Sequence, residues 1–188
     1  MVVLITALLH RMDGSEVRAA FASSTKVLAG AGIVLVFTVP MVRVYINSDV
    51  NGSGLSSMPL AMAEWVAGNV GQIWPLFAGM TGALGAFIAG SNTVSNLMFA
   101  AFQYGVAERL MMSTVMIVAL QAVGAAAGNM IAIHNVVAAS ATVGLLGKEG
   151  ATLRKTILPT IYYLLVIGVL GLIAVHVLHV TDPLMGVQ

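Results

Sequence analysis

Long stretches with at most one charged side chain dominate this sequence. Four of them run over residues 27–46, 73–104, 113–147 and 157–178. An ordinary soluble domain carries roughly 25% charged residues, whereas only 8% of these 188 residues are Asp, Glu, Lys or Arg. So few charges cannot cover a surface that faces water. The pattern therefore predicts an all-α integral membrane protein, a polytopic bundle of helices in a lipid bilayer.

The same composition excludes several classes of function. A net charge of +1 with no basic cluster leaves nothing to bind a nucleic-acid backbone. The sequence has no cysteine, which removes thiolate nucleophiles, disulfides and thiolate metal sites. We therefore expect no nucleic-acid partner, no metal site and no cofactor.

Residues 1–9 form an apolar run that is too short to cross a hydrocarbon core of roughly 30 Å. We interpret it as the end of a span whose beginning is missing, which makes the chain the C-terminal part of a longer protein. A short N-terminus at the membrane interface is the alternative. The expected organisation is a single membrane domain over 1–188 with a truncated span at 1–9, a span at 27–46, a re-entrant hairpin at 73–107, a broken span at 113–147 and a span at 157–178.

Most of the cations lie in two connections between the apolar stretches. They are Arg11, Arg18 and Lys26 before the first long stretch, and Lys148, Arg154 and Lys155 before the last. The positive-inside rule places both connections in the cytoplasm, so the connection at 47–58 and the C-terminus are expected outside. Four aromatic residues fall at predicted outer ends, where aromatic side chains anchor spans at the interface; they are Tyr45, Trp65, Trp74 and Tyr104.

Two of the apolar stretches are interrupted by polar residues. The stretch at 73–104 contains the string SNTVSN at 91–96 near its middle, which favours a re-entrant hairpin with a polar tip. The stretch at 113–147 would make a straight helix of about 52 Å, too long for one crossing. Two crossings would place Lys148 outside, so we expect one crossing with a break near 128–129 and 134–135. Irregular backbone survives at membrane depth only where it lines protein or a wet cavity.

The residues at these interruptions suit a small anion. Ser, Thr and Asn are preferred helix N-caps, so the polar string that includes Ser91, Asn92 and Thr93 would start a half-helix that continues into the apolar run at 97–102. Asn135 would cap another half-helix, and Asn129 lies beside that break. Two helix N-termini that converge at the midplane form a site for a group such as a carboxylate. The alternative is that these side chains only form hydrogen bonds between helices.

His134 is the only ionisable residue deep in a predicted span. Because histidine exchanges protons near neutral pH and intramembrane ionisable groups are commonly functional, we predict a role in proton coupling. A structural hydrogen bond is the alternative. Several glycines recur at intervals of three or four residues, a pattern that favours close helix packing; they are Gly79, Gly82, Gly85, Gly124 and Gly128.

Three long strings resemble the C-terminal part of the lactate permease family. They are GAFIAGSNTVSNLMFAAFQ at 85–103, QAVGAAAGNMIAIHNVVAASATVGLLGKEG at 121–150 and LRKTILPTIYY at 153–163. The resemblance implies a bacterial or archaeal plasma-membrane carrier that takes up lactate, and in some cases glycolate, with protons. It also implies a missing N-terminal half, since members of the family are considerably longer.

The family is in turn similar to a broader group of anion transporters built from inverted repeats, in which the tips of re-entrant hairpins contribute to the substrate and ion site. Carried over to this chain, that role falls on Ser91, Asn92 and Thr93, within a second inverted repeat. The unwound helix of that fold would correspond to 129–135. A sodium ion in place of the proton is compatible with this similarity.

The resulting prediction is a secondary active transporter for lactate and related 2-hydroxy monocarboxylates, and not an enzyme. A non-transporting membrane subunit, whose breaks merely fit a partner helix, is one alternative. An intramembrane hydrolase that uses Ser91 and His134 is another, although the chain lacks a GxSxG nucleophile turn. A homo-oligomer is compatible with the sequence. The sequence does not determine the stereochemistry of the substrate.

Overall fold

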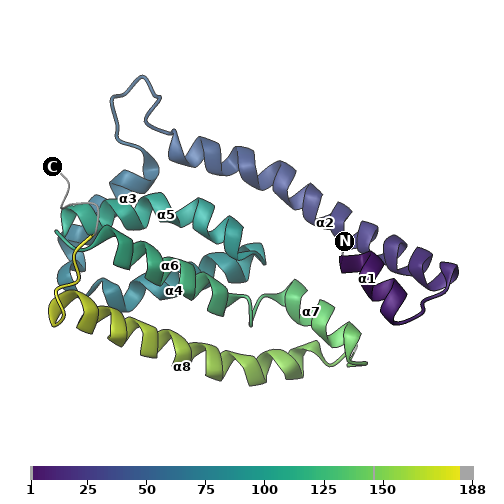
Figure 1. Ribbon diagram of the computed structural model, residues 1–188. Coiled ribbons are helices and arrows are strands. Elements are labelled where there is room, and N and C mark those ends of the chain that lie inside the picture. Colours follow the sequence, from purple (N-terminus) through teal and green to yellow (C-terminus); the bar gives the residue numbers. More distant parts are fainter. Residues whose placement is uncertain (1, 146, 183–188) are drawn as a thin grey trace. The chain divides into compact units, whose positions relative to one another are not determined.

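The computed structural model describes residues 2–145 and 147–182, and all regular secondary structure within them is helical (Figure 1). This confirms the all-α class. The helices are α1 (Val2–Leu9), α2 (Gly14–Ile46), α3 (Met58–Asn69), the 3₁₀ turn η1 (Gly71–Ile73), α4 (Pro75–Ala89), α5 (Asn92–Arg109), α6 (Thr114–Gly128), α7 (Ile133–Thr142) and α8 (Glu149–His176). The side chains at 2–4, 26–28, 30–35, 38 and 141 lie outside the described part, as do residues 183–188 and therefore the predicted outer C-terminus.

The chain divides within α2 into two units, Met1–Met41 and Val42–Gln188. In the first unit, Asp13 and Glu16 start α2 with reciprocal hydrogen bonds. The Glu16 N–H donates to Asp13 Oδ1 at 2.8 Å, and the Asp13 N–H donates to Glu16 Oε2 at 3.0 Å. This pairing satisfies N–H groups that a helix start leaves unpaired. As a result α2 begins at Gly14, well before the predicted span at 27–46.

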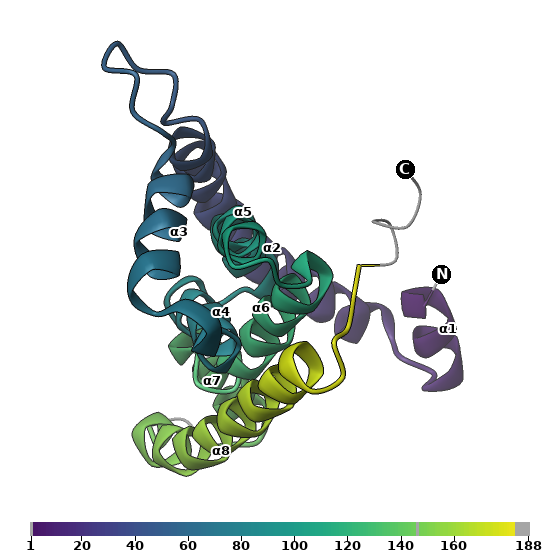
Figure 2. The ribbon, with the colours of Figure 1, turned by 90° about the vertical axis from the view of Figure 1, so that its left-hand side faces the viewer.

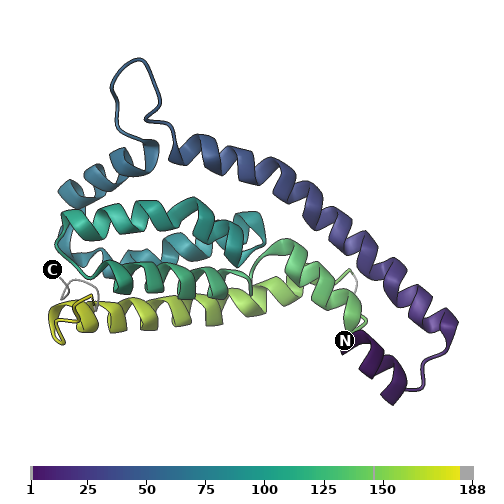
Figure 3. The ribbon, with the colours of Figure 1, turned by 45° about the horizontal axis from the view of Figure 1, so that its top comes forward.

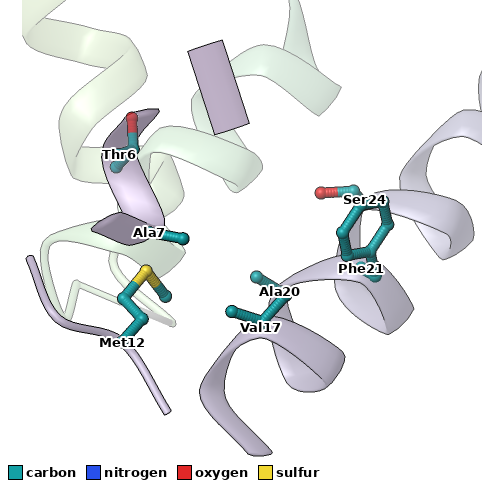
Figure 4. Close-up of a pocket in the computed structure, with 7 residues that line it drawn as sticks. All are labelled: Thr6, Ala7, Met12, Val17, Ala20, Phe21 and Ser24. Atoms are coloured by element: carbon teal, nitrogen blue, oxygen red, sulfur yellow. The ribbon is translucent and has the colours of Figure 1, made fainter. Parts of the chain in front are cut away.

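A groove of about 340 Å³ lies between α1 and the first turns of α2. Its lining is Thr6, Ala7, Met12, Val17, Ala20, Phe21 and Ser24, drawn in Figure 4. None of these side chains is charged and only two carry a hydroxyl. The groove is therefore apolar, and the polar residues predicted to bind a ligand lie in the other unit.

In the second unit, α4, α5, α6 and α8 run side by side (Figure 3). Helix α8 packs against α4 and α6, whereas α3 packs against α5 (Figure 2). Helix α7 continues beyond the end of α6 and packs on α8. At the opposite end of this unit, Arg109 of α5 forms an ion pair with Glu64 of α3 at 2.8 Å.

Glycines allow the backbones of α4 and α6 to touch. A methyl group added to Gly124 would overlap the carbonyl of Gly79, and one added to Gly82 would overlap the carbonyl of Gln121. One added to Gly128 would overlap the carbonyl of Ala83. Such contacts are made with backbone atoms, which cannot rotate away as a side chain can. The predicted packing role of these glycines is confirmed.

This unit buries several polar side chains and exposes large apolar ones. Ser95, Gln103, Gln121 and Thr160 are completely or almost completely buried. Large apolar side chains of α8 are outside, with Leu158 72% and Tyr162 71% exposed. A helix bundle in lipid needs an apolar outer surface and commonly packs through small and polar residues inside, so this distribution fits a membrane environment.

One helix of the described chain, α8, is long and apolar enough to cross a membrane alone. Helices α6 and α7 meet the same criterion as a pair and are bent by 43° where they join. A break in the stretch at 113–147 is therefore present. Helices α4 and α5, of 15 and 18 residues, form a helical hairpin, as expected for 73–107. Its re-entrant depth and an inverted repeat stay predictions.

Candidate functional site

The tip of the helical hairpin is the turn at Gly90 and Ser91 between α4 and α5. Gly90 ends α4 with φ of 63°, a left-handed conformation that glycine adopts without strain. Ser91 then caps α5, because its Oγ accepts a hydrogen bond from the Val94 N–H at 3.3 Å. The predicted polar start of a helix at this position is confirmed.

The next two residues, Asn92 and Thr93, form the first turn of α5. Asn92 is partly buried, and its Oδ1 accepts a hydrogen bond from Asn96 Nδ2 at 3.0 Å. Thr93 is exposed. In the described chain no acceptor is seen for the N–H groups of Asn92 and Thr93, as is usual for the first residues of a helix. The tip therefore offers backbone and side-chain donors together.

The break lies between the end of α6 at Gly128 and the start of α7 at Ile133. Here one expectation is wrong. Asn135 does not cap α7, because the helix begins earlier and its N-cap is Ala132, which has no side-chain acceptor. Asn135 lies instead in the first turn. The first N–H groups of α7 are consequently left without a capping side chain, at the positive end of the helix dipole.

Asn135 brings the tip and the break together. Its Nδ2 lies 3.4 Å from the Gly90 carbonyl of the hairpin, and 3.4 and 3.5 Å from Oδ1 and the carbonyl of Asn129. The turn between α4 and α5 accordingly lies beside the end of α6 in Figures 1 and 3. All three distances are at the long end of the range for hydrogen bonds, so this junction is held weakly.

His134 also lies against the tip. A methyl group added to Gly90 would collide with the imidazole ring of His134. The ring therefore lies directly on the hairpin turn, in space that a side chain larger than that of glycine would occupy. The ring is exposed in this chain. All six predicted site residues thus fall in two adjoining segments, 90–93 and 129–135, although the hydrogen bonds seen between these segments and across the break involve Asn129, Asn135 and Gly90.

Two features of this unit escaped the sequence prediction. Trp74 was expected at the interface but is buried, stacked edge-to-face on Phe102 with ring centroids 5.5 Å apart. It donates a hydrogen bond to Gln103, a polar residue inside an apolar stretch. A glutamine within an apolar stretch was the sequence signal for this buried contact, because a buried amide needs hydrogen-bond partners.

The second feature is Asp182, which lies after α8 and binds the start of α6. Burial raises the pKa of this carboxyl, but hydrogen bonds from the hydroxyls of Ser113 and Thr114 and from the N–H groups of Thr114 and Val115 outweigh it and lower the pKa to about 2. A carboxylate is favoured at a helix N-terminus by the dipole as well. No local sequence pattern predicts that Asp182, which is distant in the sequence, caps the start of α6.

The described residues contain no group of three or more His, Asp or Glu side chains that could hold a metal ion. The chemistry available at the tip and the break is therefore that of amides, hydroxyls, helix ends and one imidazole. These groups can donate hydrogen bonds to an anion without a fixed positive charge.

Comparison with known proteins shows a match between residues 1–178 and the family described as L-lactate permease. The chain belongs to this family. It is 35% identical to the putative L-lactate permease of Haemophilus influenzae over 161 residues, which cover 86% of this chain and 29% of that protein. It is 33% identical to the L-lactate permease of Escherichia coli over 181 residues, 94% of this chain and 31% of that protein.

A third relative is the glycolate permease of Escherichia coli, 32% identical over 122 residues, which cover 65% of this chain and 22% of that protein. The chain thus spans about 30% of the length of the first two relatives. No solved structure matches it significantly. The family consists of integral membrane proteins, and permeases are transporters and not enzymes, so the hydrolase alternative finds no support.

Proposed function

We propose that this chain is part of a longer secondary active transporter that takes up lactate and related 2-hydroxy monocarboxylates such as glycolate with protons. It would act in the bacterial plasma membrane, with the connection at 148–155 in the cytoplasm and the C-terminus outside. The family and the names of the relatives support the class of substrate. Direction, the coupled ion and the orientation rest on the charge pattern and on the resemblance.

The observation that carries the proposal is the junction of the hairpin tip with the break. The N-terminus of α5 and the uncapped N-terminus of α7 meet there, joined by the Asn135 amide. A carboxylate would accept hydrogen bonds from their N–H groups. The Ser91 hydroxyl still has a proton to donate, since only its oxygen is used in the cap. Asn92 and Thr93 add donors at the tip, and Asn129 and Asn135 add them at the break.

The weak bonds of Asn135 fit this assignment. An amide held at 3.4 to 3.5 Å loses little when it turns toward a ligand, whereas a short bond would oppose that change. In the proposed cycle, the carboxylate replaces the Gly90 carbonyl as the partner of the Asn135 amide. Substrate would then bind one arrangement of the tip and the break more tightly than others, and would shift the population toward that arrangement.

His134 is the proposed proton carrier. It is the titratable side chain that contacts the hairpin turn, and protonation would add a positive charge beside the proposed carboxylate. Proton and anion would therefore bind with positive coupling. Sodium at the tip is the competing coupling ion, and the dependence of uptake on each ion separates the two.

The site is tested with Asn92→Ala in the full-length permease that contains this segment. We expect loss of labelled lactate uptake with normal membrane insertion, because the variant removes donors at the tip and leaves the Ser91 cap intact. Asn69→Ala is the matched control, since Asn69 is exposed and donates only within α3, to the Trp65 carbonyl. Normal uptake by Asn92→Ala would sink the assignment and would favour a non-transporting subunit or a site elsewhere.

The proton role is tested with His134→Gln, which keeps a hydrogen-bonding side chain without titration. Uptake of lactate and of protons is measured together at several pH values. We expect the ratio of protons to lactate to fall. An unchanged ratio of protons to lactate removes His134 from the proton path. Lactate uptake that depends on sodium and not on pH identifies sodium as the coupled ion.

A further inference from the structure

A chain of buried hydrogen bonds connects the start of α4 with the interior of α5 and α6. The Trp74 Nε1–H donates to Gln103 Oε1 at 2.8 Å, and Gln103 Nε2 donates to the Ala78 carbonyl and to Gln121 Oε1, each at 3.1 Å. Gln103 and Gln121 are both 0% exposed. Each polar atom of the Gln103 amide therefore has a partner, two of them at the start of α4 and one in α6.

The chain continues from Gln121 to the first turns of α5. Gln121 Nε2 donates to Ser95 Oγ at 3.2 Å, and the Ser95 hydroxyl donates to the Gly82 carbonyl at 2.7 Å. Ser95 is also 0% exposed, and it lies three residues after Asn92. The bonds of Ser95 thus tie the turn that follows the hairpin tip to α4 on one side and to α6 on the other.

Stability alone does not require this network. Buried polar pairs can often be replaced by apolar side chains of similar shape with little loss of stability. A fully satisfied network does something that apolar packing does less well, since it favours one arrangement of its helices over alternatives with unpaired groups. Here the arrangement selected is the rotation of α5 relative to α6, and α6 is the helix that ends at the break.

We propose that Gln121 and Ser95 are positioning residues for the substrate site: they hold the first turns of α5 in the one register that aims the hairpin tip at the break. Neither residue touches the substrate. The inference rests on the proposed function for its effect on lactate, but its structural part does not. Losing the Gln121 amide should let the tip shift while the apolar and glycine contacts keep the bundle folded.

The experiment uses Gln121→Met in the full-length permease, where methionine matches the length of glutamine without its donors. The first readout is independent of substrate: Thr93→Cys is introduced as a reporter at the exposed tip, other cysteines of the full-length protein being replaced. Its rate of reaction with a thiol reagent is compared with and without Gln121→Met. We expect the labelling rate to change by about threefold or more. We expect KM for lactate to rise about fivefold, which corresponds to the net free energy of one hydrogen bond.

The two readouts separate the two proposals. An unchanged labelling rate overturns the positioning role. A changed labelling rate with an unchanged KM supports the positioning role and contradicts the placement of the substrate at the tip. Thr160→Val is the matched control, because its buried hydroxyl donates within α8 to the Thr156 carbonyl, and it should change neither quantity.

A second variant keeps the test decisive if Gln121→Met does not reach the membrane. In Gln121→Glu, a protonated carboxyl can still donate to Ser95 and accept from Gln103, whereas the ionised form cannot donate. The labelling rate and KM, each divided by the wild-type value at the same pH, should approach one in acid and depart from it as the pH rises. Because burial raises the pKa of a carboxyl, ratios near one are expected wherever the carboxyl stays protonated. Ratios that already differ from one in acid overturn the inference, since the protonated carboxyl can make both hydrogen bonds.

Discussion

The two ends and the middle of α6 are held in different ways, and the contrast separates scaffold from site. Along the helix, Gly124 and the last residue, Gly128, lie against the backbone of α4. At the N-terminal end, Asp182 accepts four hydrogen bonds. Beyond the C-terminal end at Gly128, the break is joined to the hairpin tip by the Asn135 amide, which lies 3.4 Å from the Gly90 carbonyl and 3.4 to 3.5 Å from two oxygens of Asn129.

This difference indicates which parts of the protein can move at low energetic cost. Backbone contacts and satisfied buried networks resist displacement, since any shift creates overlaps or unpaired groups. Long hydrogen bonds at a helix break resist little. A transporter needs a firm frame and an adjustable binding site, and α6 combines both within one helix. The predictions below test that gradient by substituting one residue in each region.

The largest effect is expected at the helix crossing. Gly124→Val would drive a branched side chain into the Gly79 carbonyl, and α4 and α6 would have to separate. We expect a loss of roughly 3 kcal/mol of stability, at the upper end of the cost of overpacking, measured as the thermal midpoint in detergent. Gly68→Ala is the control, because a methyl group there meets no atom within 4 Å. Equal midpoints for the two variants would show that the crossing is not rigid.

An intermediate effect is expected at the start of α6. Asp182→Asn keeps the size of the side chain but removes the charge, which should cost roughly 1–2 kcal/mol, as does loss of a helix cap. Because the folded pKa is lowered from 3.8 to about 2, this stabilisation is present above pH 3.8 and is lost as the pH falls toward 2. Thermal midpoints of both proteins should therefore converge in acid. A constant gap between them would contradict the assignment.

The smallest effect on stability is expected at the break. Asn135→Ala removes an amide that makes only long contacts, with the Gly90 carbonyl and two oxygens of Asn129, so we expect a change below about 1 kcal/mol in the same measurement. Lactate uptake should nevertheless fall strongly, since the amide is a proposed ligand. The ratio of the two effects is the quantity of interest: a variant that loses stability and uptake in proportion would make Asn135 part of the scaffold.

Much of this architecture could be predicted from local patterns. Apolar stretches indicated the helical class, and the string at 91–96 indicated a polar turn at which a helix starts, because helix capping involves residues only a few positions apart. The structure shows that Ser91 is the cap. The break in 113–147 followed from the length of the stretch and from the positions of the cations. The start of α7 was missed by three residues, since polar Asn135 suggested a cap where the helix in fact begins at Ile133.

By itself, the sequence determined that the chain belongs in a membrane and where its helices are interrupted, since hydropathy and capping act between neighbours. Only the tertiary structure decided which distant groups meet. The bond from Asn135 to Gly90 spans 45 positions, that from Gln121 to Ser95 spans 26, and that from Thr114 to Asp182 spans 68. A buried polar group must find a partner, but several partners satisfy that need equally, and the packing of the helices selects one.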